Sequence, residues 1–176
     1  MALNKAFSST KAVSTLFIVT ADNRQTATVT TIKTPSEQGY SLKDQVGFLI
    51  RKAHQRNTAI FQQHSVDEQL TPIQFSALCV IADNDNSSLT DLVQITAIDQ
   101  ATIRGIVSRL KKRGLIELVS DPRDQRKVIV RATREGMMLL DEMVPIAKEI
   151  SDITVEKLNP SEQVALTYLL KKIIEE

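Results

Sequence analysis

The sequence predicts a mainly α-helical fold with one small β-hairpin, formed by one domain or by one domain and a tail. Apolar residues recur at helical spacing over 41–66, 71–83 and 133–175. Two β-rich runs, 116–119 and 127–131, flank a turn that contains proline. Aromatic residues make up 4% of the chain and Trp is absent, whereas Leu, Ile and Val are plentiful, which favours an aliphatic core between helices.

Residues 1–40 differ in composition from the rest of the chain. They are rich in Ser and Thr and hold only two acidic residues. We expect a flexible extension that ends near residues 34–36. The short apolar run at 12–19 leaves a signal or transit peptide as an alternative, and a misassigned start codon would also explain the extension.

A long helix is expected over 41–66 and a shorter one over 71–83. Ser41 can cap the first helix, with Asp44 returning a hydrogen bond from the third position. The second helix opens with Thr71-Pro72-Ile73-Gln74, in which Thr caps, Pro occupies the first turn and Gln reaches back.

A third and a fourth helix follow. Ser88 and Asp91 open the short third helix, and Asp99 caps the fourth. Gly114 is a natural left-handed terminator for the fourth helix. The turn between the two helices contains Ala97, where helix-turn-helix turns often carry glycine, which suggests a longer turn.

Residues 99–136 combine this fourth helix with a basic hairpin, an arrangement that suits a winged helix on double-stranded DNA. The segment carries ten Lys/Arg and five Asp/Glu, a net charge of +5, whereas the rest of the chain carries −4. Neutralising phosphates releases counterions, which supplies the sequence-independent part of DNA affinity. The helix fits the major groove, and an arginine on the hairpin tip can reach the minor groove. A solvated basic face is the alternative interpretation.

Two further helices are expected after the hairpin. The first begins at Thr133, and Pro145 should bend or break it. The second begins at the start signal Asn159-Pro160-Ser161-Glu162. The apolar stripes of 41–66 and 133–175 exceed what a small winged helix over 71–132 needs for burial. We therefore expect these dimerisation helices to form an intertwined homodimer, which places two recognition helices about one turn of a palindromic operator apart.

Several classes of function are excluded by what the chain lacks. Cys79 is the single cysteine, which excludes an internal disulfide and a cysteine metal cluster. Two histidines, His54 and His64, are too few for a metal site, and we expect no cofactor. No apolar run reaches the roughly 18 residues that cross a bilayer, so we expect no membrane partner and a cytoplasmic location. The chain lacks a phosphate-binding glycine loop, H-E-x-x-H and a nucleophile elbow, and we expect no enzyme activity.

The stretch from the fourth helix onward resembles the MarR family of bacterial transcription regulators. The recognition-helix pattern runs from Thr102 to Arg109-Leu110 and on through 111–116. The wing pattern D-x-R lies within 121–126, and the family's L-T-x-x-G appears as Ala132-Thr133-Arg134-Glu135-Gly136, with Ala132 in place of Leu.

The resemblance is specific over 71–136, extends in helix layout over 41–175 and does not cover 1–40. It implies a winged helix-turn-helix flanked by dimerisation helices, so that residues 41–176 form one MarR-like domain.

The resemblance also implies that the exposed side of the first half of the recognition helix faces base edges. The base-edge candidates are Gln100, Ala101, Thr102 and Arg104, because Gln suits adenine and Arg suits guanine. Arg109 is expected to contact phosphate or to pair with the wing. The remaining expected DNA contacts are Ser108, Lys112, Arg123, Asp124, Arg126 and Lys127. Asp121-x-Arg123 and Asp124-x-Arg126 share one spacing, so either arginine can be the one that enters the minor groove.

A repressor released by a small aromatic or heteroaromatic acid or a phenol is the regulation that the resemblance implies. The sequence indicates only the place, because polar groups lie on or beside the apolar arc of the first long helix. The expected effector contacts are Arg51, His54, Asn57, Phe61, His64 and Phe75.

Three alternatives stay open. The polar groups on the first helix can instead be satisfied core or interface residues. Cys79 can make the protein a redox-sensing regulator, although its apolar neighbours favour an inert thiol. A winged helix can also bind protein rather than DNA.

Overall fold

The computed structural model describes residues 33–84, 87–120 and 128–174, and the chain divides into two compact units, Met1–Leu49 and Ile50–Glu176. The described part of the first unit begins with two short 3-10 helices, η1 (Ser36–Gln38) and η2 (Leu42–Asp44). The backbone N–H and hydroxyl of Thr34 donate to Glu37 Oε2 at 2.7 and 2.9 Å, which closes the turn that contains η1. These bonds lower the pKa of the Glu37 carboxyl.

The first long helix, α1 (Val46–His64), begins later than the sequence predicts. The cap predicted at Ser41 is wrong, because its side chain makes no capping hydrogen bond. The backbone at Gln45 is extended, with φ −78° and ψ 131°, so η2 ends before α1 begins. The side-chain amide of Gln45 (Nε2) instead donates to the Ser41 carbonyl at 2.9 Å.

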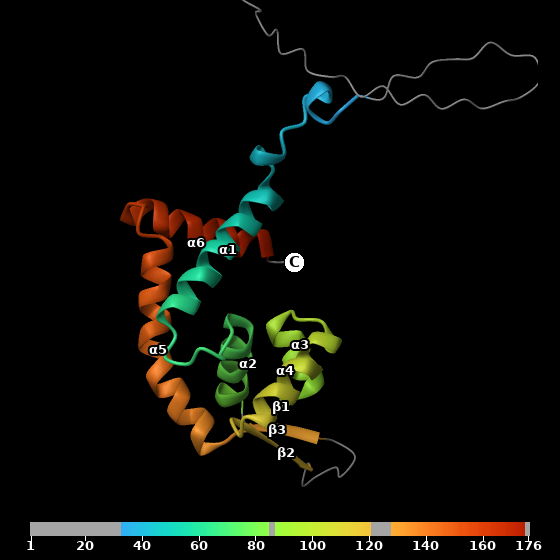
Figure 1. Ribbon diagram of the computed structural model, residues 1–176, viewed down its shortest axis with the longest axis vertical. Coiled ribbons are helices and arrows are strands. Elements are labelled where there is room, and N and C mark those ends of the chain that lie inside the picture. The colour runs from blue at the N-terminus through green and yellow to red at the C-terminus, as the bar shows by residue number, and fades with distance from the viewer. Residues whose placement is uncertain (1–32, 85–86, 121–127, 175–176) are drawn as a thin grey trace, which may run out of the picture. The chain divides into compact units, whose positions relative to one another are not determined.

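The second unit is mainly helical with one small sheet, which confirms the predicted fold class (Figure 1). After α1 its elements are α2 (Pro72–Asp83), β1 (Ser87–Ser88), α3 (Leu89–Thr96), α4 (Gln100–Lys112), β2 (Ile116–Ser120), β3 (Val128–Ala132), α5 (Arg134–Thr154) and α6 (Pro160–Ile174). The sheet is antiparallel in the order β1-β3-β2, with Leu118 and Ser87 on either side of Val130. The sequence predicts β2 and β3 but not β1, because a strand of two serines carries no periodic pattern.

Local capping residues start five helices where the sequence predicts them. The side chains of Thr71, Ser88, Asp99 and Thr133 each accept a hydrogen bond from the backbone N–H three residues later, at 2.9–3.4 Å. Asn159 does the same for α6, and the Glu162 carboxylate accepts a bond from the Asn159 N–H at 2.8 Å. Each cap satisfies N–H groups that the helix itself leaves without partners.

The end of α4 is set by Gly114, as predicted. Its φ is +73°, and its N–H donates to the Lys111 carbonyl at 2.9 Å while the Leu115 N–H donates to the Leu110 carbonyl at 3.0 Å. This is a Schellman ending, accompanied by burial of Leu110 and Leu115. The turn before α4 is not longer than usual: Ala97 itself takes the left-handed conformation, with φ 52°.

The sequence predicts a bend or a break at Pro145, and the break is absent because α5 continues through this residue. Proline removes one backbone donor and leaves the carbonyl of Asp141 without its helical partner. Both Pro145 and Asp141 are exposed, so water can satisfy that carbonyl.

Two apolar clusters form the core of the second unit. The larger joins α2, α3, α4, the sheet and the beginning of α5, with Leu78, Leu92, Ile103 and Val130 fully buried. The smaller cluster contains Ile60, Phe61, Leu70, Met143 and Ile150, from α1, the α1–α2 connection and α5. Phe75 and Leu139 pack against both clusters, so the winged helix and the flanking helices share a continuous apolar interior.

Candidate nucleic-acid interface and adjoining cavity

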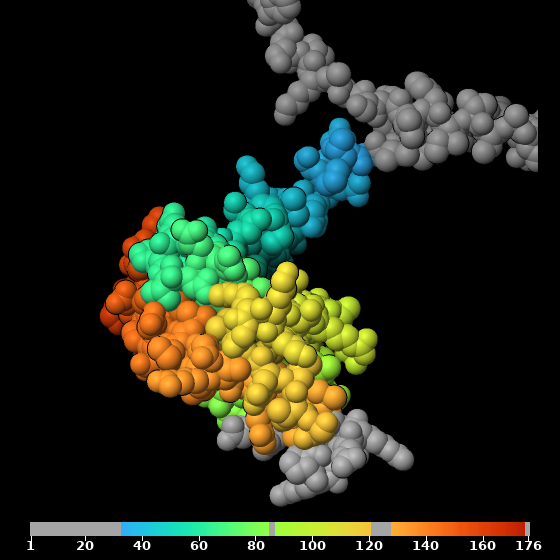
Figure 2. All heavy atoms as spheres, turned by 60° about the horizontal axis from the view of Figure 1, so that its bottom comes forward, coloured from blue at the N-terminus to red at the C-terminus, as the bar shows by residue number. Residues whose placement is uncertain are grey.

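One row of polar side chains lies open along α4. Gln100, Arg104, Ser108 and Lys112 follow one another at four-residue spacing and are all exposed. The opposite side of the helix is buried through Ile103, Ile106, Val107 and Leu110. The segment that contains α4, yellow in Figure 2, lies at the surface of the molecule. This exposed row presents amide, guanidinium, hydroxyl and ammonium groups that can meet base edges and phosphates.

The neighbouring row of α4 has different surroundings. It consists of Ala101, Gly105, Arg109 and Arg113, again at four-residue spacing. The Arg109 guanidinium lies over Gly105, since its Nη1 and Nη2 are 3.6 Å from the position a Cβ would take there. Arg113 is partly buried and forms an ion pair with Asp67 of the α1–α2 connection. The predicted DNA contacts on the helix are therefore divided between two rows.

Thr102 belongs to the cap of α4. Its N–H and hydroxyl donate to the Asp99 carboxylate at 2.9 and 2.6 Å. These bonds, the hydroxyl bond first, lower the pKa of Asp99. The Thr102 hydroxyl therefore already has an acceptor within the protein. Its expected contact with a base stays a prediction, and so do the base contacts expected of the exposed row.

The predicted wing is present as β2 and β3, with Ser120 opposite Val128. The wing contacts expected from the sequence, Arg123, Asp124, Arg126 and Lys127, lie outside the described residues.

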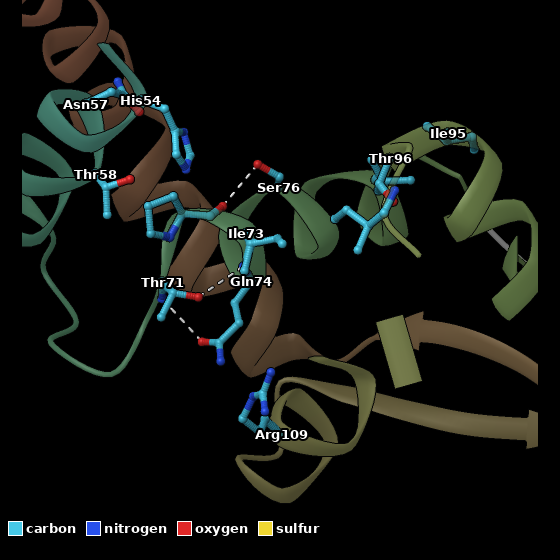
Figure 3. A pocket seen from close by; sticks show the side chains of 13 residues that line it. His54, Asn57, Thr58, Thr71, Ile73, Gln74, Ser76, Ile95, Thr96 and Arg109 are labelled. Atoms are coloured by element: carbon cyan, nitrogen blue, oxygen red, sulfur yellow. Dashed lines mark hydrogen bonds between the residues drawn. The ribbon is translucent and has the colours of Figure 1, made fainter. Parts of the chain in front are cut away.

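A cavity of about 1010 Å³ lies beside the second row of α4 (Figure 3). His54 points into it from α1, and Arg109 reaches from α4 toward Gln74 at the beginning of α2. The full lining is His54, Asn57, Thr58, Thr71, Pro72, Ile73, Gln74, Ser76, Val80, Ile95, Thr96, Ile98 and Arg109. The cavity thus combines a guanidinium, an imidazole, amides and hydroxyls with an apolar wall.

Of the six expected effector contacts, only His54 and Asn57 line this cavity. Phe61 and Phe75 instead pack together in the core, with ring centroids 5.8 Å apart. Arg51 and His64 are exposed on α1, outside the lining of the cavity. Sequence reasoning missed Arg109 and the beginning of α2, because helical periodicity on α1 cannot show which other elements face it.

A reactive cysteine, a metal site and a membrane span each place requirements on the described residues. Burial and the nearby Asp83 carboxylate raise the pKa of the half-buried Cys79 thiol, which disfavours the reactive thiolate. Among the described residues, no three His, Cys, Asp or Glu side chains are grouped to hold a metal ion. Within the same ranges, no helix has the length and apolar character to cross a membrane.

Comparison with known proteins points to DNA-binding transcription regulators. The MarR family profile matches residues 68–127. The transcriptional repressor NicR of Pseudomonas putida is 54% identical over 136 residues, which are 77% of this chain and 86% of NicR. The structure of BpsR from Bordetella bronchiseptica, whose DNA binding is regulated by 6-hydroxynicotinic acid, is 49% identical with a TM-score of 0.73 over 78% of this chain and 98% of BpsR.

A more distant structure is PcaV of Streptomyces coelicolor, solved in complex with its natural ligand. It is 25% identical, with a TM-score of 0.70 over 76% of this chain and 94% of PcaV. These matches agree with the predicted winged helix-turn-helix architecture. They also agree with the expectation that the protein is not an enzyme. The chain belongs to the MarR family of transcription regulators, which are DNA-binding proteins and not enzymes.

Proposed function

We propose that this protein is a homodimeric repressor that holds a palindromic operator through α4 and leaves it when a small aromatic acid enters the cavity. The observation that carries the proposal is the position of Arg109, which belongs to the recognition helix and also lines the cavity with His54 and Asn57 of α1. A ligand there touches the DNA-reading element directly. The proposal places the protein in the cytoplasm, where bacterial operators lie.

The DNA-binding half of the proposal rests on the exposed row of α4. Arg104 and Gln100 occupy the first turns of the helix, where the fork of Arg suits guanine and the amide of Gln suits adenine. Ser108 and Lys112 continue the row toward the end of the helix, where a hydroxyl and an ammonium suit phosphates. Arg123 or Arg126 completes the contact by entering the minor groove from the wing.

The homodimer rests on α6. None of its residues from Pro160 to Ile174 is buried, although the helix is rich in large apolar side chains. Those most exposed are Val164, Tyr168, Leu169, Leu170, Ile173 and Ile174, at 41–76%. Contiguous apolar surface of this kind is rarely left open in a monomer, and a second copy of the same helix covers it without a further partner.

The ligand class follows from the lining of the cavity. The Arg109 guanidinium and the His54 imidazole suit a carboxylate, while Pro72, Ile73 and Ile98 suit the faces of a ring. The DNA binding of BpsR, which is 49% identical, is regulated by 6-hydroxynicotinic acid, a hydroxylated pyridine carboxylic acid with both of these features. We therefore propose 6-hydroxynicotinic acid or a close relative as the effector.

The release mechanism needs only differential binding. A ligand that binds more tightly to the conformation with the wrong spacing of the two α4 helices shifts the population away from DNA. A coupling of about 1–3 kcal/mol, five- to 150-fold in affinity, is typical of such regulation.

The test has two steps. Genomic fragments are first selected on the wild-type protein, and sedimentation of the protein alone should give about twice the chain mass of 19.6 kDa. 6-Hydroxynicotinic acid is then titrated against the protein–operator complex, with 2-hydroxypyridine, which lacks the carboxylate, as the matched control. Release by the acid alone supports the proposal. Retention of DNA at saturating acid, with an unchanged melting temperature, makes the protein a constitutive binder.

A further inference from the structure

The end of the recognition helix is tied to the α1–α2 connection by a partly buried ion pair. Arg113 Nη2 donates to Asp67 Oδ2, and the two side chains are only 23% and 19% exposed. A second pair, Arg56–Glu156, is 44% and 53% exposed and has the character of an ordinary surface contact. The Asp67–Arg113 pair joins residues 46 positions apart and thus connects two separate elements.

The Asp67 side of the pair is rigidly held. Its Oδ1 accepts from the Gln69 N–H at 2.9 Å, and its carbonyl accepts from the Ser65 hydroxyl at 2.9 Å and from the Leu70 N–H at 3.0 Å. Leu70 is fully buried in the smaller core cluster with Met143 and Ile150 of α5. The Asp67 carboxylate is therefore fixed to the core that α1 and α5 build.

The Arg113 side is held as well. The Thr133 hydroxyl donates to the Gly114 carbonyl at 2.6 Å, and the Thr133 N–H donates to the Leu115 carbonyl at 3.1 Å. A Cβ at Gly136 would clash with the Leu115 carbonyl, so only glycine lets α5 approach this closely. The C-terminal end of α4 thus meets two clamps, one from α5 and one from Asp67.

Stability alone is a poor explanation for the ion pair. Among the described residues, Arg113 Nη1 is buried without a hydrogen-bond partner, so the guanidinium is only partly satisfied. A buried charge with an unmet donor costs free energy, and apolar side chains of similar volume often stabilise as well or better. The pair supplies something an apolar contact does not: one defined register between α4 and residues 65–70.

The pair also adjoins the cavity. Arg113 follows Arg109 by one helical turn on the same row of α4, and Asp67 lies four residues before Thr71, where the cavity lining on α2 begins. Segment 67–74 therefore contacts this row at the ion pair and borders the cavity near Arg109. A displacement of this segment acts on the end of α4 through Asp67.

We propose that Asp67 and Arg113 are positioning residues for operator binding: they hold α4 at the angle that DNA requires, and neither touches DNA. The proposal rests on the proposed function, since it assumes that the exposed row of α4 meets an operator. It predicts that removing the negative charge of Asp67 weakens DNA binding, which is the opposite of what charge attraction to a polyanion alone would give.

The test compares Asp67→Asn and Arg113→Gln with Lys112→Gln, which removes the neighbouring exposed charge. Affinity is measured by fluorescence anisotropy over a salt series, on the operator fragment that the wild-type protein selects. We expect D67N and R113Q each to lose at least about fivefold in affinity with an unchanged salt slope, because no phosphate contact is lost. K112Q should reduce the slope by about one. R113K, which can still pair with Asp67, should stay within about threefold of the wild type.

Two results overturn the positioning role. One is D67N binding as tightly as the wild type or more tightly, and the other is R113Q losing salt slope as K112Q does, which makes Arg113 a phosphate contact. Stoichiometric titration gives the active fraction of each variant. If D67N does not fold, the comparison of R113Q with R113K tests the positioning role instead. A wild-type protein that selects no fragment overturns the proposed function and this inference together, whereas wild-type binding with unaffected D67N overturns the inference alone.

Discussion

Two adjacent rows of side chains on the basic helix α4 have different surroundings. Gln100, Arg104, Ser108 and Lys112 are exposed to solvent. In the next row, Arg109 is also exposed but lines the cavity, and Arg113 is partly buried and pairs with Asp67. The rows differ by one position in register, which is about 100° around the helix. The net charge of a segment therefore does not tell how many of its cations share one surface, because the helical position of each cation decides what it meets.

In the proposed function, two α4 helices are held at a fixed spacing on the operator, so the largest expected effect comes from breaking the proposed dimer. Ile173→Glu places a charge on the apolar surface of α6, where Ile173 is 61% exposed in the single chain. We expect sedimentation near 19.6 kDa and a loss of palindrome affinity of at least about hundredfold, because the second half-site no longer binds as part of one complex. Lys172→Glu on the same helix is the control and should remain dimeric. An Ile173→Glu dimer would place the interface elsewhere.

Within the proposed dimer, the exposed row should dominate operator recognition. Arg104→Ala should weaken operator binding by about tenfold and relax the base preference at one position of each half-site, since a bidentate base contact is worth about 1–3 kcal/mol. A panel of single-base operator variants measures both effects. Uniform loss across the panel would instead assign Arg104 to phosphate.

The start of both rows depends on the Asp99 cap. Its bonds to Thr102 lower the pKa of Asp99 below its ordinary value of 3.8, so its contribution is complete above that pH and is lost as the pH falls through the lower, folded-state pKa. Asp99→Ala should lower the melting temperature at pH 7. The difference from the wild type should shrink on acidification below pH 3.8. A difference that is constant with pH would argue against the carboxylate as the cap.

The smallest effect is expected at the turn before α4. Ala97 takes φ 52°, which costs a residue with a Cβ about 1–2 kcal/mol relative to glycine. Ala97→Gly should raise the free energy of unfolding by about 0.5–1 kcal/mol after the added chain entropy of glycine is subtracted. Denaturant unfolding measures this change, and a destabilised variant would mean that the Ala97 methyl group makes a favourable contact.

Local signals in the sequence predicted much of the fold and less of the site. Caps such as Thr71, Asp99 and Thr133 act within three residues, so they can be found without tertiary information. The sequence misplaces the start of α1, because Ser41 matches a capping pattern while the backbone at Gln45 is extended.

The site depends on contacts that no local pattern contains. The cavity draws its lining from four helices and the turns beside them, and Asp67 meets Arg113 across 46 residues. The sequence shows the four-residue spacing of Arg109 and Arg113, but only the packing of segment 67–74 shows that Arg109 borders the cavity and that Arg113 is paired. The sequence cannot tell whether Phe61 and Phe75 contact a ligand or each other, because an aromatic pair suits a bound ring as well as it suits a core.

The central claim is that the two rows of α4 have separable functions, and a paired measurement on Arg104→Ala and Arg109→Ala tests it most directly. Each variant is titrated with operator DNA and, by calorimetry, with 6-hydroxynicotinic acid. We predict that R104A loses operator affinity and binds the acid like the wild type. R109A should bind the acid at least about tenfold more weakly and keep operator affinity within about threefold. Equal losses of operator affinity in both variants, with acid binding unchanged, would contradict the division of the helix.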